Sequence, residues 1–160
     1  MSSQEGQEPT LASLVTEIRR DGTTESDDPA ARTEAVVDEA SETLFSGDNP
    51  NIDDGLIKQS LPELLLLLVG LRETDAHGKG IMEDLNRFFG AQLSPGTVYP
   101  ALHDLEEAGL LEMRELVQTK EYRIDDTEAV RETLREGMGQ HLALGFVFQR
   151  ALQELGEDDE

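Results

Sequence analysis

The chain has 160 residues, enough for one globular domain with extensions, and no cysteine, which excludes disulfides and thiolate zinc sites. Thirty-five acidic residues against thirteen basic ones give a net charge of −22, whose self-repulsion is screened at molar salt. The sequence has no apolar run long enough to cross a membrane and no signal peptide at its start. We therefore expect a cytoplasmic protein that needs no cofactor and no metal.

The acid excess extends over most of the chain, whereas lysine occurs only at positions 58, 79 and 120. This composition resembles that of halophilic proteins, in which high salt offsets the repulsion. The alternative is a disordered acidic tail on an ordinary protein. We favour the halophilic interpretation, because the acids continue into the predicted helices.

Residues 1–55 are predicted to be an acidic, flexible arm, partly disordered, with two short helical patches. Apolar side chains recur at helical spacing from Leu11 to Ile18 and again from Val36 to Leu44. Helices this short are unstable alone in water, so each needs a surface to pack on. That surface is either the chain's own domain, which we favour, or a protein partner of the arm.

The domain predicted over residues 56–124 begins with two helices. Ser60 and Glu63 form a capping-box pattern that starts a helix reaching about Glu73. This helix is apolar nearly all round, as expected of a helix enclosed by others. A second helix covers 79–89 and ends at a glycine.

A third helix and two strands complete the predicted domain. Ser94 is the expected N-cap, a proline follows in the first turn, and the helix runs to Ala108 before a left-handed glycine. Strands at 110–116 and 120–124 would form a hairpin. The fold class is therefore mainly α, a winged helix-turn-helix of three helices plus a two-stranded wing. The side chains expected to bury the third helix are Val98, Leu102 and Leu105.

Residues 125–160 are predicted to be a C-terminal dimerisation helix followed by an acidic tail. One helix from Thr127 to Leu155 would be about 40–45 Å long. Its apolar end exceeds what a domain of this size can cover, so we expect a second copy to cover it in a C2 dimer. The alternative is a helix folded back on its own domain or on the arm. The residues expected at the dimer contact are Leu134, Met138, Leu142, Gly145, Phe146 and Leu152.

The third helix carries a resemblance to a known family. The stretch Ser94-Pro-Gly-Thr-Val-Tyr-Pro-Ala-Leu102, with Ala76-His77-Gly78 before it and Gly109-Leu-Leu-Glu112 after it, resembles the PadR family of transcriptional regulators. The resemblance covers about Leu61 to Ile124, and the arm has no counterpart in the family. It implies a homodimeric winged-helix repressor whose third helix, 94–108, enters the major groove of DNA.

The expected DNA contacts come from the outward side of the third helix, the start of the second and the turn of the wing. Tyr99 would either reach a phosphate or cover the core, and His103 would either donate to DNA or be an ordinary exposed residue. Pro100 suggests a special local geometry, because proline is costly inside a helix. The predicted contacts are Lys79, Ser94, Thr97, Tyr99, Pro100, His103, Thr119 and Lys120.

Two features depart from the family pattern. His103 and Asp104 stand where Arg or Lys is common, and the wing is poor in charge, with Lys120 and Arg123 against Glu121. Because Lys and Arg on phosphates produce the steep salt dependence of most DNA binding, we expect a shallower one here.

The predicted function is a sequence-specific DNA-binding transcription regulator, a repressor by the resemblance, which binds double-stranded DNA as a homodimer. The alternative is a winged-helix adaptor that binds proteins and not DNA. We do not expect an enzyme, because the sequence has no nucleophile–base pair or metal-ligand spacing, and Gly78-Lys79-Gly80 is too short for a phosphate loop.

Overall fold

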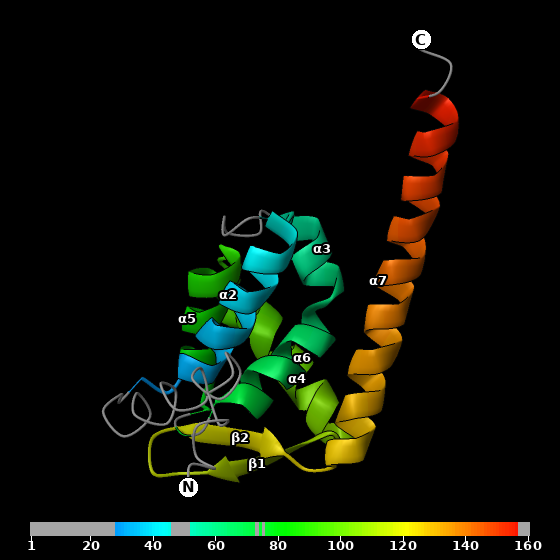
Figure 1. Ribbon diagram of the computed structural model, residues 1–160. Coiled ribbons are helices and arrows are strands. Elements are labelled where there is room, and N and C mark those ends of the chain that lie inside the picture. The colour runs from blue at the N-terminus through cyan, green and yellow to red at the C-terminus, as the bar shows by residue number, and fades with distance from the viewer. Residues whose placement is uncertain (1–27, 46–51, 73, 75, 157–160) are drawn as a thin grey trace, which may run out of the picture.

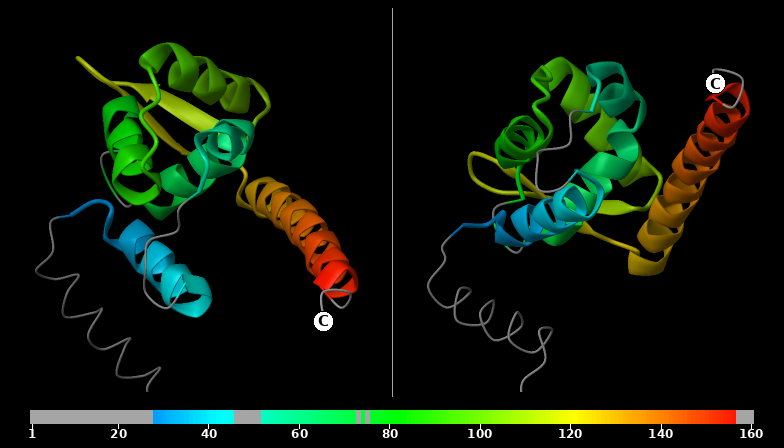
Figure 2. Two further views of the ribbon diagram at one scale, coloured as in Figure 1. Left: turned by 90° about the horizontal axis from the view of Figure 1, so that it is seen from above. Right: turned by 45° about the horizontal axis from the view of Figure 1, so that its top comes forward.

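The computed structural model describes residues 28–45, 52–72, 74 and 76–156, and Figure 1 shows its elements. Three helices and a hairpin form a winged helix, which confirms the predicted mainly α fold. A last helix leaves the domain beside the wing, and its far end stands clear of the rest (Figures 1 and 2). The elements are α2 (Ala31–Phe45), α3 (Asp54–Gln59), α4 (Leu61–Leu71), α5 (Gly78–Phe89), α6 (Pro95–Glu107), β1 (Leu111–Glu115), β2 (Lys120–Ile124) and α7 (Thr127–Gly156).

Helix α4 is the centre of the core. It contacts α2, α3, α5, α6, α7 and β2, and Leu65, Leu66 and Leu68 are completely buried. This environment explains why α4 is apolar nearly all round, as the sequence predicted. The helix ends at Leu71, two residues before the predicted end.

Helix α4 does not start as the capping-box pattern predicted. Ser60 also ends the short helix α3, which the sequence analysis missed, and its backbone (φ −98°, ψ 15°) is not the extended conformation of an N-cap. Its hydroxyl does not cap α4 and instead lies 3.1 Å from Nε2 of His141 on α7. The serine therefore joins the first half of α7 to the domain.

A buried ion pair fixes α5 against α4. The Arg72 guanidinium at the end of α4 donates two hydrogen bonds, of 2.7 and 3.0 Å, to the Asp84 carboxylate on α5. The side chains are only 6% and 2% exposed, and the hydrogen bonds to Asp84 raise the pKa of Arg72. Because both charges are removed from water, losing either partner would leave the other at a high cost.

Both helices of the helix-turn-helix end at a left-handed glycine, as predicted. Gly90 (φ 67°) ends α5, and the next amide closes back to the carbonyl of Leu85 at 3.2 Å. Gly109 (φ 80°) follows α6, and the amide of Leu110 closes back to Leu105 at 3.0 Å. The two turns set the directions of α6 and of the wing.

The wing is an antiparallel hairpin tied to the start of α5. Its register pairs Leu111 with Ile124 at one end and Glu115 with Lys120 at the other, so β1 is one residue shorter at each end than predicted. The amide of Tyr122 donates to the carbonyl of Ala76 at 2.8 Å, just before α5. This bond holds the wing beside the N-terminus of α5.

The second predicted patch of the arm is helical and packed. Helix α2 lies against α4, with Thr33 and Val37 buried, and Arg87 of α5 binds Asp28 at 3.1 Å and Glu34 at 2.8 Å. This patch therefore packs on its own domain, which is the alternative that we favoured for it. The first patch lies outside the described residues.

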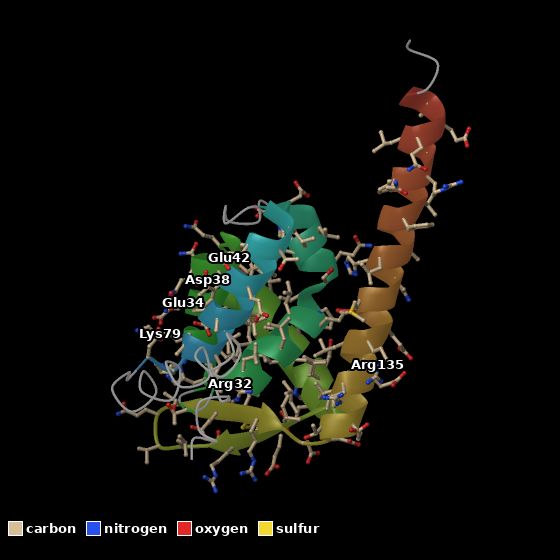
Figure 3. The ribbon with its side chains drawn as sticks, viewed as in Figure 1. Arg32, Glu34, Asp38, Glu42, Lys79 and Arg135 are labelled. Atoms are coloured by element: carbon tan, nitrogen blue, oxygen red, sulfur yellow. The ribbon has the colours of Figure 1, made fainter. Side chains whose placement is uncertain are left out.

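Helix α2 presents acids to solvent. Figure 3 shows Glu34, Asp38 and Glu42 following one another along the helix, and all three are exposed. A hydrogen bond from the Ala30 amide, supported by Arg87, lowers the pKa of Asp28. The three acids of α2 add to the acidic character of this side of the domain.

Helix α7 is continuous, but its two halves lie in different surroundings. The Asp126 carboxylate caps its start by accepting from the Ala129 amide at 3.1 Å. Val130 is buried and Leu134 is half-buried against the core, whereas Met138 is already 58% exposed. Among the described residues, no helix is long and apolar enough to cross a membrane.

Geometry explains why the predicted apolar row does not stay on one face. Residues four apart are about 40° out of line at 3.6 residues per turn, so the row from Val130 to Phe146 turns by about 160°. The start of the row faces the domain and its end faces solvent. The large apolar side chains exposed on α7 are Met138, Leu142, Leu144, Phe146, Val147, Phe148, Leu152 and Leu155.

Candidate nucleic-acid interface

Helix α6 has one buried and one exposed side, as the sequence predicted. Val98 and Leu102 are completely buried and Leu105 nearly so, which anchors the helix on α4 and α5. The predicted DNA contacts on this helix all lie outside the core, and all are exposed: Ser94, Thr97, Tyr99, Pro100 and His103. Helix α6 runs through Pro100 without a break.

The N-terminus of α6 is open to an anion. Ser94 has the extended backbone of an N-cap (φ −76°, ψ 157°), but its hydroxyl lies 3.3 Å from the Thr97 hydroxyl and makes no capping bond. The positive end of the helix dipole is therefore not satisfied by the cap side chain, and such an end favours phosphate. Ser94 is an N-cap by position and not by hydrogen bonding.

The charge of α6 differs between its two ends. From Ser94 to His103 the sequence has no acid, whereas Asp104, Glu106 and Glu107 follow at the C-terminal end. The His103 ring lies 3.5 Å from Glu107, and both side chains are mostly exposed. Only the N-terminal part of α6 therefore presents a surface that a phosphate backbone can approach without repulsion.

A groove joins α5, α6 and the wing. It encloses about 590 Å³ and contains four of the predicted contacts from three elements: Lys79, Tyr99, Thr119 and Lys120. Its other lining residues are His77, Gly78 and the wing residues 115–118. The fold thus brings together side chains from distant parts of the sequence, since Lys79 and Lys120 are 41 positions apart.

Tyr99 rests on Gly78 at the start of α5. A Cβ at position 78 would lie only 2.3 Å from the tyrosine hydroxyl, so a larger residue would displace the ring. The ring is 37% exposed, and it both covers the domain and faces the groove. Local spacing in the sequence gives no sign of this contact between Gly78 and Tyr99, because only the fold brings the two residues together.

Two neighbours hold this corner of the groove in place. His77 caps α5, with Nδ1 accepting from the Gly80 amide at 3.2 Å, so the neutral ring carries its proton on Nε2. Tyr122 is buried, and this burial, with a smaller contribution from Tyr99, raises the pKa of its hydroxyl. Neither residue was among the predicted site residues, because their roles depend on tertiary contacts.

The wing carries balanced charge. Arg123 forms a two-pronged ion pair with Glu112 at 2.9 and 3.2 Å, which lowers the pKa of Glu112 and raises that of Arg123. In the strand register Arg114 faces Glu121 and Glu115 faces Lys120. Each basic residue of the hairpin therefore stands opposite an acid, so the wing is not poor in charge, contrary to the prediction, but carries charges that balance.

Within the part of the chain that the structure describes, no group of three or more His, Asp or Glu side chains could hold a metal ion. The candidate interface consists of an open helix end, a groove with two lysines and a tyrosine, and a charge-balanced hairpin.

The arrangement of α4, α5, α6 and the β1–β2 hairpin defines the winged helix-turn-helix class of proteins. Residues 66–136 match the transcriptional regulator PadR-like family. The resemblance to this family is therefore confirmed over these residues. The family consists of transcription regulators and not of enzymes.

Curated relatives of the chain come from haloarchaea. It is 42% identical over 98 residues to the transcriptional activator GvpE of Haloferax mediterranei, covering 61% of this chain and 50% of that protein. It is 39% identical over 103 residues to GvpE1 of Halobacterium salinarum, covering 64% and 53%. The chain thus spans about half the length of these relatives. Their source agrees with the halophilic interpretation of the composition.

A solved structure is also similar. A PadR-like transcription factor from Bacteroides fragilis is 22% identical, with a TM-score of 0.47, over 61% of this chain and 94% of that chain.

Proposed function

We propose that this protein regulates transcription by binding duplex DNA through α5, α6 and the wing. The observation that carries the proposal is the acid-free outward side of α6 from Ser94 to His103, next to the groove with Lys79 and Lys120. In helix-turn-helix proteins this end of the recognition helix contacts base edges in the major groove. The wing and the two lysines would then contact phosphates.

We also propose that the protein acts as a homodimer joined by the second half of α7. Seven large apolar side chains are exposed there, from Leu142 to Leu155, and Leu142 and Phe146 are 64% and 65% exposed. A second copy has the same unburied surface, so an isologous contact would cover both at once. The division into an arm (1–55), a winged helix (56–124) and a dimerisation region (125–160) follows from this proposal.

The proposed sign of regulation is activation. The resemblance to PadR proteins favoured repression, but the curated relatives named above are transcriptional activators. A protein partner of the N-terminal arm, if one exists, would have to bind the exposed acidic side of α2 or residues before it.

Binding to DNA can be tested with purified protein in molar KCl and DNA fragments recovered by genome-wide mapping of bound sites. We expect Tyr99→Ala and Lys120→Ala to weaken binding and to remain dimeric. Lys58→Ala is the matched control, because Lys58 is an exposed lysine on α3 that does not line the groove. If the wild-type protein binds no recovered fragment, the adaptor alternative replaces the regulator.

The same assay tests the salt dependence. Most proteins that neutralise several phosphates lose about 10³–10⁵ in affinity between 50 and 200 mM salt. Because few basic side chains lie at this interface, we expect the DNA affinity to decline much less with added salt, or to increase. A steep decline between low and molar KCl would contradict this expectation.

A further inference from the structure

The outward side of α6 offers few groups for hydrogen bonding to bases. At about 100° per residue, Gly96 and Pro100 lie within about 20° of the direction opposite to the buried Val98. Both are exposed, and neither side chain has a donor or an acceptor. The centre of the outward side of α6, which would face the DNA bases, is therefore apolar.

The residue types that usually read bases are absent from this helix. Arg and Lys read guanine and Asn and Gln read adenine through paired hydrogen bonds, and the sequence of α6 contains none of the four. Asp104 and Glu107 could accept from cytosine, but they lie at the C-terminal end, beyond the part that enters the groove. Besides the hydroxyls of Ser94, Thr97 and Tyr99 and the ring of His103, the N-terminal part offers apolar contact with the methyl group of thymine.

Thr97 can add to this contact. It is exposed, its hydroxyl lies 3.3 Å from that of Ser94, and the same side chain carries a methyl group. The Pro100 ring lies about one turn further along α6.

We infer that Pro100 and Thr97 are specificity-determining residues that read the half-site through thymine methyl groups in the major groove. This inference rests on the proposed DNA-binding function and deepens it. It predicts half-sites with thymine where the N-terminal part of α6 meets the groove. The preference follows from burying methyl groups and not from hydrogen bonds to guanine or adenine.

The test uses duplexes selected by the full-length protein from a randomised pool in molar KCl. The same duplex is then made with deoxyuridine in place of single thymidines, which removes only the 5-methyl group. We expect affinity to fall about fourfold for each methyl group that is contacted, the factor that corresponds to burying one such group. Deoxyuridine outside the half-sites is the control and should have no effect.

Protein variants connect the effect to the two residues. Thr97→Ser removes the methyl group and keeps the hydroxyl, and Pro100→Ala removes the ring and keeps a good helix former. On the duplex lacking the contacted methyl, each variant should lose less affinity than on the thymidine duplex, whereas Lys120→Ala should weaken both duplexes equally.

Three results would overturn the inference: equal affinity for the thymidine and deoxyuridine duplexes, selected half-sites without thymine, or additive losses in the variants. In each of these the protein still binds DNA, so the proposed function survives. If the protein selects no duplex at all, the inference and the proposed function both fail.

Discussion

Helix α4 and the second half of α7 are both rich in apolar side chains, but their surroundings differ. The leucines of α4 are enclosed by helices on several sides, and Leu65, Leu66 and Leu68 are completely buried. On α7, Leu142 and Phe146 remain about two-thirds exposed. The winged helix therefore completes its own core, whereas α7 has apolar surface left for another molecule.

In the proposed dimer, one helix would serve two purposes. Val130 and Leu134 fix the start of α7 to the domain core, and Ser60 contacts His141 one to two turns further on. After that point the helix leaves the domain. Changes in the winged helix should therefore act on folding, and changes in the second half of α7 should act on assembly.

The largest effect on folding is expected at the buried ion pair. Asp84→Ala would leave the Arg72 charge buried and should lower the free energy of unfolding by about 3–5 kcal/mol. Urea unfolding at molar KCl measures this loss. Glu83→Ala, which removes an exposed acid from the same helix, should change stability by less than about 0.5 kcal/mol. Similar losses in the two variants would show that the buried pair is unimportant.

The largest effect on assembly is expected at Phe146. Phe146→Asp should raise the dissociation constant of the dimer about a hundredfold or more, because each dimer loses two buried aromatic side chains. Sedimentation equilibrium measures the constant, and circular dichroism should show an unchanged fold. Gln140→Asp adds the same charge at an exposed polar position of α7 and should leave the dimer intact. A dimer unaffected by Phe146→Asp would move the interface elsewhere.

A smaller effect is expected where Tyr99 meets Gly78. Gly78→Ala would force the ring aside and should cost about 1–3 kcal/mol, the usual cost of overpacking. The cost should largely disappear when Tyr99 is first shortened to alanine, as a double-mutant cycle would reveal. If Gly78→Ala still lowers stability in the Tyr99→Ala background, the requirement for glycine at position 78 comes from the backbone of α5 and not from the tyrosine ring.

The smallest effect is expected on the wing. Glu112→Gln breaks an ion pair with Arg123 in which both side chains are largely exposed, and such pairs contribute little to stability. The melting temperature should stay the same within error. Because the substitution frees Arg123 from its acid, DNA binding should become tighter and more salt-dependent. A marked loss of stability would show that the wing is held by this pair.

The sequence predicted the parts of the fold that depend on local patterns. The left-handed glycines at 90 and 109, the buried stripe of α6 and the two strands could be recognised because each needs only neighbouring residues. The start of α4 was predicted at the right position, with Ser60 as the N-cap residue, but the predicted capping bond is absent, since α3 precedes the helix directly and the Ser60 hydroxyl contacts His141 instead. Long-range contacts of this kind leave no trace in local spacing.

The candidate site shows the same limit. The exposed positions of α6 followed from helical periodicity, and their placement agrees with the structure. The support under Tyr99 from Gly78 and the cap from His77 did not follow, because they connect α6, α5 and the wing through space. Whether the predicted residues contact DNA stays a prediction.

The length of the continuous 30-residue α7 would also determine the distance between two DNA-binding domains. In the proposed dimer, the point at which two such helices cross determines how far apart the two copies of α6 stand. One residue inserted between His141 and Phe146 would rotate the far end by about 100° and shift it by about 1.5 Å. The spacing of paired recognition sequences along the double helix would then be encoded in the length and pitch of a segment that never touches a base.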